Sequence, residues 1–141
     1  MRIHSRLVVA ALLAMFAALA SAAYDVRMVG IVFDPGSDTA EVADEITGDE
    51  SVMYRFRPRE GQILQVSLRP ESDHTQFIVY APGKWPGDVL HDSERTGSRD
   101  YRGRVDKDGF HAVSVFQDQA AIAEGSTSRY ELVIRLTDAA D

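Results

Sequence analysis

The sequence predicts an all-β fold, a small antiparallel β-sandwich of the jelly-roll kind with about seven or eight strands. Three observations support this. Apolar and polar residues alternate with a period of two along most of the chain, which is the pattern of half-buried strands. Turn residues separate these runs about every ten residues. No long i, i+3, i+4, i+7 apolar pattern follows residue 23, so the helical crossovers that parallel sheets need are not expected.

Each expected strand is a short run bounded by turn residues. The run 77–81 is almost continuously apolar, so we expect it to be covered on both faces. The run 39–46 holds alanine and glutamate, which would also permit a helical turn. In chain order the expected strands cover residues 26–33, 39–46, 52–56, 64–68, 77–81, 101–105, 111–115 and 130–136.

Two long loops interrupt this pattern. Residues 82–100 are rich in glycine, proline, serine and charge, with one short element expected around Val89 and Leu90. Residues 117–128 form the second loop, whose start could be helical. The DKDG sequence at 106–109 is expected to form a tight hairpin turn, because glycine adopts a positive φ easily. The same four residues resemble a calcium loop, but no carboxylate follows at the required spacing.

The amino-terminal residues have the pattern of a secretory signal peptide. Arg2 and Arg6 precede an apolar run over residues 7–20, and a small-x-small cleavage site ends at Ala22. The run is shorter than the roughly 18 to 20 residues that cross a bilayer, so we expect cleavage of residues 1–22 and no membrane anchor afterwards. Residues 23–141 would then be a single exported β-sandwich domain. Loss of the two arginines changes its formal charge from −7 to −9.

Composition argues against several classes of function. The absence of cysteine excludes a disulfide scaffold and a thiol nucleophile, and the acidic charge argues against binding to nucleic acid. His111 shares an apolar face with Val113 and Val115, so it is expected in the core or at its rim, while His74 and His91 fall in turns or loops. No metal site is therefore predicted. No catalytic signature is present, so we expect neither an enzyme nor a cofactor.

An ordered set of short motifs resembles one protein family. Gly48 and the strand residue Tyr54 are followed by the sequence GQILQVSL, which is also typical of pre-peptidase C-terminal sandwiches. Further along come FIVYAPG, YRG, DG, VSV and YELVI, at 77–83, 101–103, 108–109, 113–115 and 130–134. In this order, over residues 32–136, the set is similar to the periplasmic inhibitors of g-type lysozyme and their exported relatives.

The resemblance implies a β-sandwich that blocks a muramidase by inserting loops into its cleft. The partner would be g-type lysozyme or another peptidoglycan-active protein, and the acidic charge would steer the domain toward a cationic enzyme. The loop after the penultimate strand matters most in that picture. Family members carry arginines and an asparagine there, whereas this chain has Gln117, Asp118 and Gln119. The arginines of the first long loop, among them Arg95 and Arg99, have two interpretations. They are either part of a solvated face, which is the one we favour, or one of them supplies the missing guanidinium and pairs with a catalytic glutamate of the partner.

Two aromatic residues complete the predicted binding set. Tyr54 remains where the family shows several tyrosines. Trp85 lies between two Pro-Gly steps and is expected to cover one end of the core, with an exposed anchor for a partner or a sugar ring as the alternative. The predicted partner-binding residues are Tyr54, Trp85, Arg95, Arg99, Gln117, Asp118 and Gln119. The alternative function is that of an envelope sandwich that binds a ligand or glycan without inhibiting lysozyme.

Overall fold

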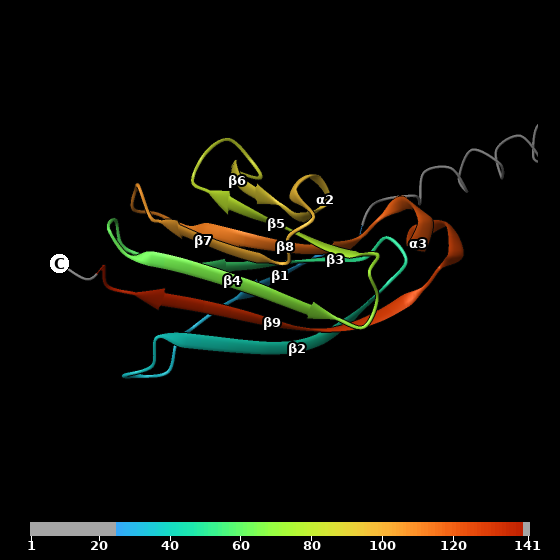
Figure 1. Cartoon of the computed structure of the whole chain (residues 1–141), viewed down its shortest axis with the longest axis horizontal. Helices are drawn as coiled ribbons and strands as arrows, with labels where there is room; N and C mark the ends of the chain where they lie inside the picture. The colour runs from blue at the N-terminus through green and yellow to red at the C-terminus, as the bar shows by residue number, and fades with distance from the viewer. Residues whose placement is uncertain (1–24, 140–141) are drawn as a thin grey trace, which may run out of the picture.

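Nine strands form two sheets that pack face to face in the computed structural model, which describes residues 25–139 (Figure 1). This confirms the prediction of an all-β sandwich, with more strands than expected. Two short helices accompany them, α2 (Ser93–Thr96) and α3 (Gln119–Glu124). The strands are β1 (Val26–Gly30), β2 (Thr39–Thr47), β3 (Ser51–Phe56), β4 (Ile63–Pro70), β5 (Thr75–Ala81), β6 (Asp88–Asp92), β7 (Asp100–Arg104), β8 (His111–Gln117) and β9 (Thr127–Thr137).

The chain crosses between the sheets at almost every connection. Sheet A has the order β1-β3-β8-β5-β6, and sheet B has the order β2-β9-β4-β7. All pairs are antiparallel except β1 with β3, which is parallel. Among the described strands, only β5 and β6 are neighbours both in the chain and in a sheet. The connections therefore gather at two ends, called here the helix end, where α2 and α3 lie, and the loop end opposite.

The predicted hairpin turn at 106–109 is wrong. This turn joins β7 of sheet B to β8 of sheet A, so it is a crossing at the loop end and not a hairpin. A turn sequence specifies a change of direction, but it does not say which sheet receives the next strand. Gly109 still has a positive φ of 123°, and an added Cβ would stand 3.0 Å from the ring of Pro82. Both facts favour glycine at this position.

The core lies between the inward faces of the sheets, where alternate residues of each strand are buried. In β5, Phe77, Val79 and Ala81 are buried, but Ile78 and Tyr80 on the outer face are only half-buried. The expectation that this run is covered on both faces is therefore wrong for the described part of the chain, since no layer of helices within residues 25–139 covers the outer face of sheet A.

The two long loops contain more structure than predicted. Strand β6 includes Val89 and Leu90, as expected, but α2 was not foreseen. Asp92 caps α2, since its carboxylate accepts a hydrogen bond of 3.0 Å from the backbone N–H of Glu94. The helical alternative for residues 117–128 is confirmed by α3. The helical alternative for 39–46 is wrong, because β2 pairs with β9 along its whole length.

The predicted signal peptide lies outside the described residues. Within residues 25–139, no helix is long and apolar enough to cross a membrane.

Candidate functional site

The seven predicted partner-binding residues lie in three separate regions. Trp85 lies at the loop end, and Tyr54 lies in the core. The other five are at the helix end, namely Arg95, Arg99, Gln117, Asp118 and Gln119. The helix end is therefore the place where most of the predicted site comes together.

Tyr54 and Gln117 are buried, and both make hydrogen bonds within the fold. Tyr54 is 0% exposed, and its hydroxyl lies 2.5 Å from that of Tyr130. Burial raises the pKa of both phenols, which therefore stay neutral. Gln117 donates from Nε2 to the carbonyls of Ser126 at 2.7 Å and Gly48 at 3.3 Å, tying two loops of the helix end to β8.

Arg95 and Arg99 differ sharply in what they are free to do. The guanidinium of Arg99 donates to the carbonyl oxygens of Thr75 at 3.0 Å and Asp73 at 3.1 Å, so it fixes the β4–β5 loop. Arg95 has an 87% exposed side chain and only a 3.6 Å ion pair with Asp92. Of the two arginines, Arg95 has the more exposed guanidinium, since the side chain of Arg99 is only 31% exposed.

An acidic hollow of about 270 Å³ lies where the β2–β3 loop, α2 and the start of α3 meet. Its carboxylates come from the β2–β3 loop, from α2 and from the residue that caps α3, and no cation is among its lining residues. Phe116 and Ile122 add half-buried apolar surface. The carboxylates belong to Asp49, Glu50, Glu94 and Asp118. Of these four, only Asp118 was predicted from the sequence. Acidic residues at strand ends are typical of solvated turns, and the sequence does not show which strand ends meet in the fold.

Asp118 is fixed by two interactions and lies beside a histidine that sequence reasoning did not select. Its carboxylate accepts from the backbone N–H of Ala121 at 3.1 Å, which caps α3, and lies 2.8 Å from Nδ1 of His74. The hydrogen bond with Asp118 raises the pKa of His74. Burial opposes ionisation of Asp118, but the hydrogen bonds outweigh it and lower its pKa. Within residues 25–139, no three side chains converge as metal ligands.

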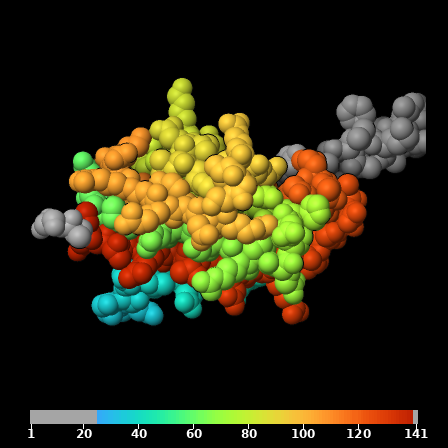
Figure 2. Space-filling model, in the orientation of Figure 1, coloured from blue at the N-terminus to red at the C-terminus, as the bar shows by residue number. Residues whose placement is uncertain are grey.

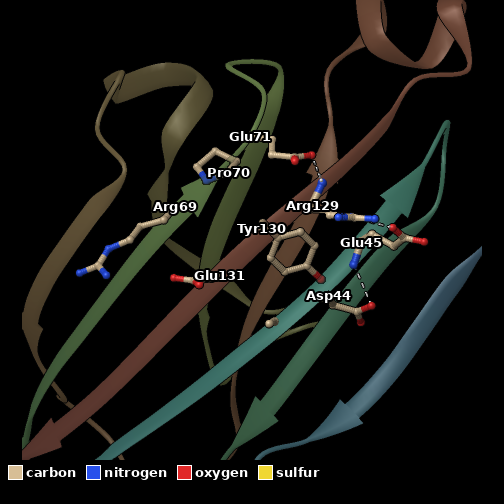
Figure 3. Close-up of a pocket in the computed structure, with 9 residues that line it drawn as sticks. Asp44, Glu45, Arg69, Pro70, Glu71, Arg129, Tyr130 and Glu131 are labelled. Carbon is tan, nitrogen blue, oxygen red and sulfur yellow. Dashed lines mark hydrogen bonds and ion pairs between the residues drawn. The ribbon is translucent and has the colours of Figure 1, made fainter.

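A more open hollow of about 560 Å³ lies on the outer face of sheet B, beside the helix end (Figure 3). The short side chain of Ala43 faces Glu131 on the neighbouring strand and leaves space between longer residues. Arg129 lies between two glutamates, with its backbone N–H 3.2 Å from Oε2 of Glu71 and its Nε 3.5 Å from Oε2 of Glu45. Carboxylates thus also predominate on this side of the helix end.

The prediction that Trp85 covers the end of the core is wrong. Its side chain is 71% exposed, and the β5–β6 loop that carries it projects from the surface (Figure 2). The loop is held against β5 at Gly87, where an added Cβ would stand 2.9 Å from that of Tyr80. The core is closed at this end by His111, which is 2% exposed, with its ring 6.2 Å from that of Phe56. Trp85 is therefore exposed, as the alternative interpretation of this residue requires.

These features define a class of protein, a cysteine-free β-sandwich whose sheet-crossing loops gather at two ends. No protein-family model matches the chain, and no curated protein matches it in sequence. Among solved structures it is similar to Aeromonas hydrophila PliG, a periplasmic lysozyme inhibitor of g-type lysozyme. The TM-score is 0.74 at 22% identity, over 82% of this chain and 100% of that one.

Two further structures extend the comparison. Salmonella Typhimurium PliG, also a periplasmic inhibitor of g-type lysozyme, has a TM-score of 0.59 at 22% identity, covering 79% of this chain and 98% of its own. The pre-peptidase C-terminal domain of Bacillus anthracis collagenase has a TM-score of 0.52 at 12% identity, covering 79% and 96%. The likeness is one of fold, and it confirms at that level the resemblance to g-type lysozyme inhibitors predicted from the motifs.

Proposed function

We propose that this protein is an exported, periplasmic inhibitor of a muramidase of the g-type lysozyme kind, acting by binding and not by catalysis. The observation that carries the proposal is the structural match to Aeromonas hydrophila PliG, which is covered over its whole length at a TM-score of 0.74. The signal-peptide pattern of residues 1–22 supports export. Residues 23–141 would be the mature domain.

In this proposal the helix end is the binding surface. Its carboxylates at Asp49, Glu50 and Glu94 surround an apolar patch, which is the arrangement that attracts and then docks a cationic partner. Arg95 supplies the exposed guanidinium that would pair with a carboxylate in the muramidase cleft. In this arrangement the loop after β8 contributes the carboxylate of Asp118, and α2 contributes the guanidinium of Arg95.

The direct test is lysis of peptidoglycan by purified g-type lysozyme, with and without the purified chain 23–141. We expect inhibition at micromolar concentrations, and weaker inhibition of c-type and i-type enzymes. Unchanged lysis by the g-type enzyme at these concentrations would overturn the proposal.

Charge variants locate the surface. Replacement of Glu50 and Glu94 by glutamine should slow association several-fold and reduce its dependence on salt. The matched control replaces Glu41 and Glu60, which are exposed and lie toward the loop end, and it removes the same charge elsewhere. Arg95→Ala should speed dissociation. Equal effects of the two glutamine pairs would show that net charge alone matters and would rule out the helix end.

The exposure of Trp85 supports a second candidate, an envelope sandwich that binds a glycan or another ligand. An indole that is 71% exposed on a projecting loop offers a flat apolar face to a sugar ring. Titration with soluble peptidoglycan fragments should then change the fluorescence of this lone tryptophan, and Trp85→Ala should abolish binding. This candidate is abandoned if neither the emission nor the melting temperature responds.

A further inference from the structure

The outer faces of the two sheets differ in chemistry. The outward positions of sheet B are rich in charge, for example at Glu41, Glu45, Arg102, Arg129, Glu131 and Arg135. On the strands of sheet A, the outward positions carry only two charged residues, Arg55 and Asp92. A sheet face that simply meets water is normally polar, so the composition of sheet A points to a covered face.

Cross-strand register shows that the apolar positions of sheet A form continuous rows. Met28, Met53, Ser114 and Ile78 lie side by side across four strands. Met53 is 5% exposed and yet lies outside the core cluster, as expected for an outward residue shielded by its neighbours. Met28 on the flanking strand is 46% exposed, so the row continues to an open edge.

The next row adds aromatic and cationic groups. Arg55, Ala112, Tyr80 and Val89 follow one another across four strands, and Val89 is 59% exposed. The guanidinium of Arg55 lies 4.5 Å from the centroid of the Phe110 ring, which is 50% exposed. Exposed aromatic side chains beside arginine are typical of protein interfaces.

The register of this face is complementary to a second copy of itself. A two-fold axis along β8 would place β3 of one copy over β5 of the other, and β1 over β6. Arg55 and Tyr80 are both in register with Ala112, so each Arg55 would lie over Tyr80 of the other copy, an arrangement that repeats by symmetry. Asp92, the other outward charge, is already engaged within its own chain by the N–H of Glu94 and by Arg95.

The size of the face suits the centre of such an interface. Five strands at about 4.8 Å spacing and seven residues at about 3.3 Å give a projected area of about 450 Å². A standard interface covers about 800 Å² on each partner, with an apolar centre and a polar rim. The sheet would form the centre, and the connections of the loop end would contribute to the rim.

We propose that the outer face of sheet A is a symmetric interface between two copies of this protein. Two such sheets stacked face to face would bury Met28, Met53, Ile78 and Phe110 of both copies. The face is separate from the loops of the helix end, so dimerisation and lysozyme inhibition can fail independently of each other.

Sedimentation equilibrium of the chain 23–141 at micromolar concentrations tests the proposal. We expect the mass of a dimer. Met28→Lys should raise the dissociation constant about tenfold or more, because the ammonium group would be buried without a partner. The matched control is Val133→Lys on the outer face of sheet B, in register with Glu41, which should leave the dimer intact.

A monomer at all concentrations overturns the proposal, and so does a dimer that Met28→Lys and Val133→Lys weaken equally. Circular dichroism confirms that each variant folds. If Met28→Lys does not fold, Phe110→Ser tests the same face from an exposed position. A monomer that sediments with phosphatidylglycerol vesicles would assign the face to lipid and would also overturn the proposal. Lysozyme inhibition by a strictly monomeric protein would leave the proposed function standing.

Discussion

The hydroxyl groups of Tyr54 and Tyr130 lie 2.5 Å apart and join the two sheets inside the core. Tyr54 comes from β3 of sheet A, and Tyr130 comes from β9 of sheet B. A second link between the sheets is the ion pair of Arg27 and Asp44, at 2.9 Å. A third is the buried hydrogen bond of 2.7 Å from the hydroxyl of Thr75 on β5 to that of Ser128 on β9. Polar bonds thus supplement the apolar contacts between the two layers.

Removal of both hydroxyls of the tyrosine pair should cost less stability than the sum of the two single removals. Tyr54→Phe or Tyr130→Phe leaves a buried hydroxyl without its partner, and we expect each to lower the free energy of unfolding by about 1–3 kcal/mol. The double variant should be less destabilised than the sum of the two. Urea denaturation of the four proteins measures this coupling, with Tyr80→Phe on the outer face as the control. Additive losses would show that the two hydroxyls do not interact.

The pair of His74 and Asp118 should make the helix end sensitive to pH. Asp118 raises the pKa of His74, so the stabilisation is complete below the ordinary histidine pKa of 6.5 and is lost as pH rises through the raised value. Titration of His74 by proton NMR should give a pKa above 6.5, and Asp118→Asn should return it toward that value. Asparagine still caps α3, so the helix remains as an internal control. An unchanged pKa in the variant would contradict the pairing.

The buried imidazole of His111 should make the protein less stable in weak acid. Burial lowers the pKa of His111, so the unfolded chain takes up a proton near pH 6.5 that the folded protein does not. The free energy of unfolding should therefore fall as pH decreases below about 6.5. His111→Phe, which keeps a ring against Phe56, should reduce this slope in urea denaturation at several pH values, whereas His74→Gln should not. Equal slopes in wild type and His111→Phe would refute the assignment.

Trp85 should behave as a solvent-exposed indole in the native protein. Because its side chain is 71% exposed, iodide should quench its emission nearly as well before unfolding as after. Trp85→Ala should change the free energy of unfolding by less than about 0.5 kcal/mol. Strong protection from iodide in the native state would mean that the indole is covered.

The predictions from sequence were most accurate where burial follows local alternation. Strands such as β4 and β9 were placed within one to three residues because every second side chain is apolar. The pairing of strands was not predictable in the same way. The parallel contact of β1 with β3 and the crossing at residues 106–109 depend on which distant segments meet, and turn residues do not encode that choice.

The site was predicted less well than the fold for a related reason. Tyr54 and Gln117 were selected from motifs, but those motif positions point into the core. Arg99 looked like a free cation in a polar loop, yet backbone carbonyls of another segment accept its hydrogen bonds. Whether a polar side chain faces a partner or its own fold depends on neighbours far away in the sequence.

The repeated crossing between sheets has a kinetic consequence. With only β5 and β6 adjacent in both chain and sheet, almost every native contact among the described strands must wait for the closure of a long loop. Folding should therefore be slow, in the range of milliseconds to seconds, and no fragment should fold alone. A chain that folds slowly stays unfolded for longer after synthesis. This would suit the export proposed above, because secretion channels of the Sec type pass unfolded chains.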